Sequence, residues 1–296
     1  NVLPHAVGVL SGLGLADALA ATAIATQEVV LFNRHGQHVW RDGRGLDAGY
    51  PFPQYSIHRG ELQMLLYRAV RERLPQSALR LGLSLNRFTQ SDDKVVAAFH
   101  DRRGAAHAIE ADVLLGVDGI HSAVRHQLYP TEGKPKWSRM ILYRGTSITP
   151  QFLSGRSMVQ MGHKDQKFVC YPIKREHHDR GESFTNWIAD VRVPDSEALQ
   201  PEDWNGRAAP GKFAHLYKDW KFSWLDVPAM IAAASDIFEF PMIDRDPLPR
   251  WTFGRVSLGG DAAHPMYPIG SNGATQAIMD AKALAEGFAR HGGDWR

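Results

Sequence analysis

The chain has 296 residues, of which 44% are hydrophobic and 22% charged, and its formal net charge is +2. This length and composition are ordinary for a globular protein with enough core to fold independently, and the small charge favours neither nucleic acid nor a membrane as partner. No apolar run reaches the roughly 18 residues of a membrane-spanning helix, and no signal peptide opens the chain. The single cysteine, Cys170, excludes an internal disulfide, so we expect an inert thiol and a cytoplasmic protein.

The first half of the chain alternates helical patterns with antiparallel strand pairs. In chain order we expect a helix over 4–12, followed over 15–21 by its continuation or a short second helix. A hairpin of 28–33 and 37–40 with Gly36 at its turn, a helix over 59–74, and a meander of strands 83–88, 95–100 and 106–109 come next. The apolar run 112–117 shows no alternation, which predicts a strand buried on both faces.

The second half predicts an antiparallel sheet, which the hairpin of 28–40 would join. Short alternating runs separated by polar turns mark its strands, at 140–146, 158–161, 167–172 and 184–193. The pattern over 204–234 is interpreted as helical, and 238–242 as a return to the first part of the fold. A strand at 256–258 and a helix from about Ala274 follow.

The segment 254–280 carries the most information. A short apolar strand leads into Gly259-Gly260-Asp261, then a loop rich in proline and glycine, then a helix. The glycines allow close approach of a ligand, and the unpaired N–H groups of the helix start favour partial negative charge. This arrangement suits a polyhydroxylated, phosphorylated cofactor; the alternative is an ordinary strand-to-helix loop, with Asp261 as a helix cap or turn residue.

Two further motifs stand upstream: 111–125, where a buried strand is followed by Asp118-Gly119 and a Ser/Arg helix start, and 56–66, where Arg59 opens a helix. With 254–280 they resemble the FAD-dependent aromatic hydroxylases, the single-component flavoprotein monooxygenases related to para-hydroxybenzoate hydroxylase. Within that family the chain is most similar to the phenazine-modifying monooxygenases, through the stretches 162–168, 186–190 and 220–228.

The resemblance implies a mixed α/β fold, with a Rossmann-like FAD-binding domain interleaved with an antiparallel-sheet substrate domain. We expect residues 1–26, 56–135 and 237–296 in the first, and 27–55 and 136–236 in the second. The family's opening glycine loop has only one candidate, Gly12-Leu-Gly-Leu-Ala-Asp17, which lacks the last glycine and follows a helical pattern. We interpret it as a helix end, and we expect the chain to lack the first βαβ unit.

The resemblance also assigns roles to individual residues. Asp261 would bind a ribityl hydroxyl of FAD, with Gly260 beside it. The isoalloxazine ring would lie by the loop and helix start, at Pro268, Gly270, Gly273, Ala274 and Thr275. Asp118 and Gly119 would contact the pyrophosphate region, Arg59 the phosphate or ribityl chain, and Leu85 the adenine through its backbone. A plain turn at Asp118 and a surface cation at Arg59 remain the alternatives.

The implied reaction is hydroxylation, or oxidative decarboxylation, of a planar aromatic compound such as a phenazine or a salicylate-like acid. It uses FAD, transiently bound NAD(P)H and O₂, through a flavin C4a-hydroperoxide, so no catalytic side chain is expected. The substrate would lie between the loop 265–271 and the sheet, against Tyr143, Tyr171, Met266 and Tyr267. The histidines show no metal-binding spacing, so no metal is expected. The protein would be a monomer or homodimer.

Two alternatives stay open. One is a flavin-dependent oxidoreductase of another type, an epoxidase or a reductase-like enzyme. The other is a non-catalytic apo fragment, because the phosphate-binding glycine loop is not found in the sequence. From the missing first βαβ unit we also expect an apo form, with no bound FAD and the loop over 266–275 displaced or mobile.

Overall fold

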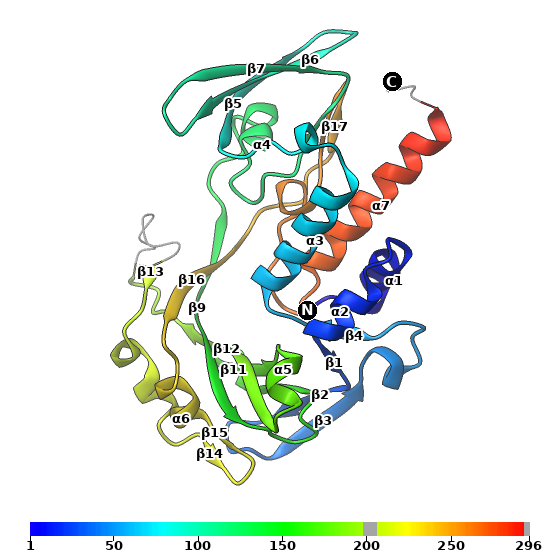
Figure 1. Ribbon diagram of the computed structural model, residues 1–296. Helices are drawn as coiled ribbons and strands as arrows, with labels where there is room; N and C mark the ends of the chain where they lie inside the picture. Colours follow the sequence, from blue (N-terminus) through cyan, green and yellow to red (C-terminus); the bar gives the residue numbers. More distant parts are fainter. Residues whose placement is uncertain (198–205, 293–296) are drawn as a thin grey trace. The chain divides into compact units, whose positions relative to one another are not determined.

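The computed structural model describes residues 1–197 and 206–292, which form two compact units (Figure 1). Unit 1 comprises Asn1–Leu65 and Trp137–Met242, and unit 2 comprises Leu66–Lys136 and Ile243–Arg296. Each unit is therefore built from two separate stretches of chain. The predicted FAD-binding and substrate-binding domains are defined by function, and these structural units do not test them. Their limits therefore stay a prediction.

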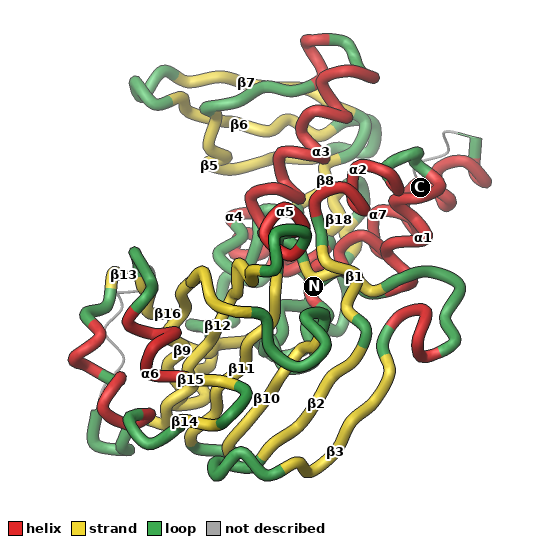
Figure 2. Tube along the Cα trace, turned by 60° about the horizontal axis from the view of Figure 1, so that its bottom comes forward, coloured by secondary structure: helices red, strands yellow, loops and turns green. Residues whose placement is uncertain are grey.

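Unit 1 is organised around one eight-stranded sheet, whose strands lie side by side in the order β13-β16-β9-β12-β11-β10-β2-β3 (Figure 2). Its strands are β2 (Glu28–Phe32), β3 (His38–Gly43), β9 (Lys136–Pro150), β10 (Ser157–His163), β11 (Gln166–Pro172), β12 (Glu182–Arg192), β13 (Gly206–Arg207) and β16 (Ile237–Asp244). The predicted strands and the joining hairpin are confirmed. One pair, β10 with β2, is parallel, whereas β9 with β12, β12 with β11, and β11 with β10 are antiparallel pairs.

The two faces of this sheet differ because side chains alternate along each strand. One face forms the main hydrophobic core, with Phe168, Trp187, Phe213 and Tyr217 fully buried. The other face carries polar side chains of three strands: Arg144 of β9, Lys167 and Tyr171 of β11, and Asn186 and Asp190 of β12. We call this face the polar wall, and the face that forms the hydrophobic core the packed wall.

The segment 206–234 covers the packed wall, and here the predicted helix is wrong. Short elements replace it: η3 (Pro210–Lys212), η4 (Ala214–Tyr217), β14 (Lys221–Phe222), β15 (Leu225–Asp226) and α6 (Val227–Ala232). Prolines and glycines interrupt the backbone, and the aromatic side chains reach the core from these irregular pieces rather than from one helical stripe. The first residues of the predicted helix, Trp204 and Asn205, lie outside the described part of the chain.

The start of the chain forms the rest of unit 1. Helices α1 (Pro4–Gly12) and α2 (Ala16–Thr22) confirm the two predicted helices, and Gly14 between them has a φ of +70°, which supports the helix-end interpretation. Strand β1 (Ile24–Thr26) pairs with β4 (Gln54–Ser56). The remaining short helices are η1 (Gly45–Ala48) and α5 (Arg175–His178), and α3 (Arg59–Arg73) runs from unit 1 into unit 2.

Unit 2 contains the predicted meander and the strand-to-helix segment (Figure 1). The meander is β5 (Leu83–Gln90), β6 (Val95–Asp101) and β7 (Ala106–Ala111), preceded by η2 (Gln76–Ala78). A second sheet has the order β17 (Thr252–Phe253), β18 (Val256–Leu258), β8 (Leu114–Gly116). The helical elements are α4 (Ala123–Leu128), η5 (Gly260–Ala262) and α7 (Gly273–His291). No described helix is long and apolar enough to cross a membrane.

The strand expected over 112–117 is shorter and more exposed than predicted. It is reduced to β8, which pairs in parallel with β18. Leu115 is 37% exposed and Val117 68% exposed, so the prediction of burial on both faces is wrong. The apolar run alone therefore did not establish that both faces of this strand are covered.

Candidate functional site

Strand β18 delivers the chain into a tight turn at Gly260. Its φ of +55° is the left-handed conformation that favours glycine, and a Cβ there would lie 3.4 Å from the Ala277 side chain. The next residue, Asp261, is exposed and makes no hydrogen bond to any described residue. The turn thus presents a carboxylate that is available to a ligand.

Helix α7 holds this turn through Asp280. Its Oδ2 accepts hydrogen bonds from the backbone N–H of Gly260 at 2.8 Å and from Nε2 of His264 at 2.7 Å. Asp280 follows Gly273, the first residue of α7, by seven residues, which places both on one helix face. Sequence reasoning gave Asp280 no role. The available signal was an acidic residue two turns into the helix, on the face of the first glycine.

Arg125 connects the two glycine-aspartate motifs within unit 2. It is 1% exposed, and its Nη1 donates to the carbonyls of Ala262 and Ala263, both at 3.0 Å. The same guanidinium pairs with Glu132, and that hydrogen bond lowers the pKa of the Glu132 carboxyl. Sequence analysis noticed the arginine at this helix start but did not assign it this contact.

Asp118 supports the start of helix α4, whose N-cap residue is Ser122. It accepts hydrogen bonds from the Ser122 hydroxyl and, at 2.8 Å, from the backbone N–H of Ala123. Gly119 follows with a φ of +81°. The carboxylate is therefore already engaged within its own turn, as the alternative interpretation foresaw, and its contact with the pyrophosphate region stays a prediction.

The loop before α7 contains a turn closed by a hydrogen bond from the N–H of Ser271 to the carbonyl of Pro268, with Gly270 at φ +81° in its third position. Helix α7 begins at Gly273, where Asn272 makes no side-chain cap hydrogen bond, and Ala274 and the buried Thr275 lie in its first turn. A Cβ on Gly273 would lie 3.9 Å from Oδ1 of Asp261. The carboxylate and the helix start are therefore neighbours.

These features fit FAD. An exposed carboxylate suits the ribityl hydroxyls, and the N-terminal end of a helix beside it suits the oxygen-rich edge of the flavin ring. The glycines leave room for close approach of a ring. Two predicted contacts lie elsewhere: Leu85 is a half-buried residue of β5 beside a register shift that ends at Arg87, and Arg59 is the exposed first residue of α3. Their contacts with FAD stay predictions.

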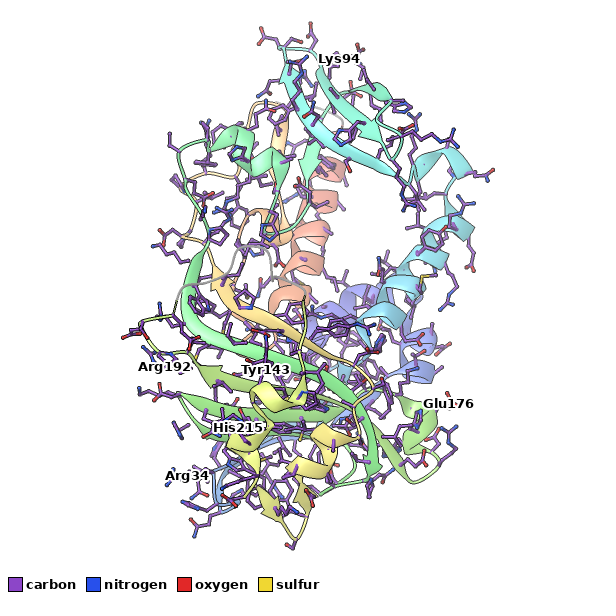
Figure 3. All side chains as sticks on the ribbon, turned by 90° about the vertical axis from the view of Figure 1, so that its left-hand side faces the viewer. Arg34, Lys94, Tyr143, Glu176, Arg192 and His215 are labelled. Carbon is purple, nitrogen blue, oxygen red and sulfur yellow. The ribbon has the colours of Figure 1, made fainter. Side chains whose placement is uncertain are left out.

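The two tyrosines predicted against the substrate lie on opposite faces of the eight-stranded sheet. Tyr143 is in the packed core, stacked on Phe213 with ring centroids 4.1 Å apart, and burial raises its pKa to about 12 (Figure 3). Tyr171 pairs in register with Asn186 on the polar wall, and burial raises its pKa as well. The expectation that both line one wall is therefore wrong. Alternate residues of a strand point to opposite faces of the sheet, and the sequence does not reveal which set faces the core.

The polar wall holds three side chains that sequence reasoning missed. Arg144 Nε, Asn186 Nδ2 and Asp190 Oδ1 are buried and have no hydrogen-bond partner among the described residues. Burial lowers the pKa of Arg144 and raises that of Asp190, which Lys167 partly offsets from 3.4 Å. The guanidinium of Arg144 also lies 5.5 Å from the centre of the Phe240 ring. Such unmet polar atoms are uncommon and indicate a ligand or water.

The last two predicted substrate residues, Met266 and Tyr267, belong to unit 2, in the loop before α7. Met266 is 36% exposed and Tyr267 is half-buried. Their contact with substrate stays a prediction.

Comparison with known proteins gives consistent matches. The model of a family described as FAD binding domain matches residues 3–197 and 236–295. A phenazine 1,6-dicarboxylic acid hydroxylase of Lysobacter antibioticus is 43% identical over 288 residues, 96% of this chain and 71% of the relative. A 3-amino-4-hydroxybenzoate 2-monooxygenase of Streptomyces platensis is 30% identical over 299 residues, 97% of this chain and 68% of the relative. The crystal structure of Klebsiella pneumoniae HpxO with FAD and uric acid shares the fold, with a TM-score of 0.73 at 20% identity over 96% of this chain and 68% of that one.

Proposed function

The chain belongs to the family of FAD-dependent aromatic hydroxylases, and from this premise we propose that it transfers one oxygen atom of O₂ to a planar aromatic carboxylic acid at the expense of NAD(P)H. The observation that carries the proposal is the exposed carboxylate of Asp261. It is fixed beside the N-terminal end of helix α7 by Asp280 and Arg125, residues that contact its loop rather than the ligand.

Asp261 would hold the ribityl chain of FAD, while Gly270, Gly273 and the N–H groups of Ala274 and Thr275 would receive the flavin ring. When bound, FAD accepts hydride from NAD(P)H and activates O₂. The helix start of α7 would stabilise negative charge on the ring. Arg125 and Asp280 set the position of the loop, so that the groups expected to contact FAD would already be in place before the cofactor binds.

The substrate class follows from the relatives and from the polar wall together. The two relatives are named for a phenazine dicarboxylic acid and an amino-hydroxybenzoate, both aromatic carboxylic acids. In this chain the polar wall offers the unpaired donors of Arg144 and Asn186, which suit a carboxylate. Tyr171 lies on the same wall and would contact the ring.

The reaction balances in either of two forms. In simple hydroxylation the ring C–H becomes C–OH, the second oxygen atom leaves as water, and NAD(P)H supplies the two electrons. In oxidative decarboxylation the carboxylate leaves as CO₂ and the hydroxyl takes its place. We expect the reaction to take place in the cytoplasm, in a monomer or homodimer, with NADH or NADPH as donor.

The test is NAD(P)H consumption by the purified, FAD-loaded protein. Phenazine-1-carboxylate and hydroxybenzoates should accelerate it, and chromatography should detect a hydroxylated or decarboxylated product. Acceleration without a product would indicate a flavin oxidoreductase of another type. Protein that takes up no FAD would support the non-catalytic alternative.

A further inference from the structure

A small polar cavity lies beside helix α4, entirely within unit 2. Its volume is about 150 Å³, whereas a single water molecule needs only about 10–15 Å³, so it has room for a group of several heavy atoms. None of its lining residues is among those proposed to contact FAD or substrate, and none of the described side chains that line it is aliphatic. Its charged and aromatic lining residues are His121, Arg125, His126, Tyr129, Glu132 and Arg245.

The two arginines of this cavity share one carboxylate. Glu132 Oε1 accepts from Arg125 Nη2, and its Oε2 accepts from Arg125 Nε at 2.8 Å and from Arg245 Nη1 at 3.1 Å. The hydrogen bond from Arg125 holds the pKa of Glu132 below its usual range, so this carboxylate stays charged. Two guanidiniums against one carboxylate leave an excess of one positive charge. Because the three side chains are at most 18% exposed, water screens this charge only in part.

Two other carboxylates stand nearby, and both have cationic or donor partners of their own. Asp118 accepts from the Ser122 hydroxyl and from the backbone N–H of Ala123. The Asp246 carboxylate pairs with Lys136 at 2.6 Å. Neither therefore cancels the excess charge of the cavity.

The arginines differ in the donors that they leave for a ligand. All five N–H groups of Arg125 have described acceptors, so this side chain forms a fixed wall. Arg245 donates through Nε to the carbonyl of Ile120 and through Nη1 to Glu132 and the carbonyl of Gly133, but its Nη2 makes no hydrogen bond to any described residue.

One histidine adds a further donor. His126 is exposed, and its ring makes no hydrogen bond to any described residue. It follows Ser122 by four residues and precedes Tyr129 by three, which places it on the helix face that lines the cavity. The Tyr129 hydroxyl already donates to the carbonyl of Arg250 at 2.6 Å. Arg245 Nη2 and the His126 ring are thus the donors that a ligand would meet.

We propose that this cavity binds a phosphate group, held by Arg245 Nη2 and the His126 ring against the positive charge of Arg125. A phosphate group is an anion with several acceptor oxygens, which matches N–H donors and an excess of positive charge. The same chemistry is offered by inorganic phosphate and by a phosphate monoester such as the 2′-phosphate that distinguishes NADPH from NADH. Phosphate binding here does not depend on the proposed hydroxylation.

The test is calorimetry on the FAD-loaded protein at neutral pH, with sodium chloride keeping the ionic strength constant. The probes are inorganic phosphate, NADP⁺ and NAD⁺, and the two oxidised nucleotides cannot reduce the flavin. We expect saturable binding of phosphate, of NADP⁺ in preference to NAD⁺, or of both, with a dissociation constant of about 1 mM or lower.

Variants assign this binding to the cavity. Arg245→Met should weaken it by about ten- to a hundredfold, the range for a hydrogen bond to a charged group. His126→Ala removes no described contact and should weaken it by about two- to tenfold. Glu132→Gln, nearly isosteric, should strengthen it, because it removes the negative charge that competes with the ligand. Arg102→Met is the matched control, since Arg102 is an exposed arginine of unit 2 that does not line the cavity.

The two nucleotides separate the sources of phosphate. A preference for NADP⁺ over NAD⁺ that disappears in Arg245→Met and in His126→Ala would assign the site to a nucleotide monoester. Equal behaviour of the nucleotides, with inorganic phosphate sensitive to both variants, would assign it to free phosphate. Binding that neither variant changes, losses that Arg102→Met reproduces, or no binding of phosphate together with no preference for NADP⁺ would overturn the proposal.

Discussion

At the scale of single residues, carboxylates with different surroundings take different roles. Asp261 is exposed and makes no described hydrogen bond, whereas Asp118 accepts hydrogen bonds within its own turn and Asp280 accepts them from Gly260 and His264. Only the first is free for a ligand. Sequence alone identified Asp261 because it follows a glycine pair at a strand end. It gave no role to Asp280 or Arg125, because their partners are backbone groups 20 or more residues away in the chain.

The substitution Asp261→Ala should separate cofactor binding from stability. We expect FAD to dissociate one to two orders of magnitude more readily, from roughly 1.5–3 kcal/mol for a hydrogen bond to a charged group. The free energy of unfolding without FAD should change by less than about 0.5 kcal/mol, because no described contact is lost. Flavin titration and urea denaturation measure the two quantities. An unchanged dissociation constant would remove Asp261 from the site.

The substitution Asp190→Asn should change how stability depends on pH. Burial raises the pKa of Asp190 in the folded protein, so the stability linked to its protonated form is fully present below the unfolded pKa and is lost as pH rises through the folded value. The variant should therefore unfold at a higher temperature than the parent near neutral pH, and the difference should shrink as the pH falls toward the ordinary Asp range. Thermal melts across pH measure this. A constant difference at every pH would contradict it.

At the scale of elements, local patterns predicted most helices and strands, and long-range packing decided the rest. Periodicity located α1, α3, α7, the meander and the strands β2, β3 and β9 to β12 of the eight-stranded sheet. It failed over 206–234, where aromatic side chains fill the core from irregular backbone. It also could not assign the faces of β9, since residues of both parities mix polar and apolar side chains, and so Tyr143 was expected on the wrong wall.

Two glycines of unit 2 give opposite predictions for the same substitution. Gly260→Ala should destabilise the protein by roughly 1–2 kcal/mol, because its φ of +55° is strained for alanine, and should weaken FAD binding through the displaced turn. Gly287→Ala, in α7 with no atom within 4 Å of the added Cβ, should instead stabilise it by about 0.5–1 kcal/mol. Urea denaturation compares them. Equal effects would mean that the left-handed turn at Gly260 does not shape the site.

At the scale of the whole molecule, the candidate contacts fall in both units. The proposed flavin loop belongs to unit 2, and the polar wall and Arg59 belong to unit 1. The sequence predicted the family and the mixed α/β fold, because three motifs in a fixed order suffice for that. The substrate wall was not predictable, since its residues come from separate strands and meet only through sheet register.

The most direct test of the central claim is isotope incorporation. The FAD-loaded protein would be given NAD(P)H, a phenazine or hydroxybenzoate carboxylic acid and ¹⁸O₂, and the product analysed by mass spectrometry. We predict one labelled oxygen atom in the aromatic product, with about one NAD(P)H consumed per product formed. NAD(P)H oxidation that yields only hydrogen peroxide with every aromatic acid, or a product whose oxygen comes from water, would contradict the assignment.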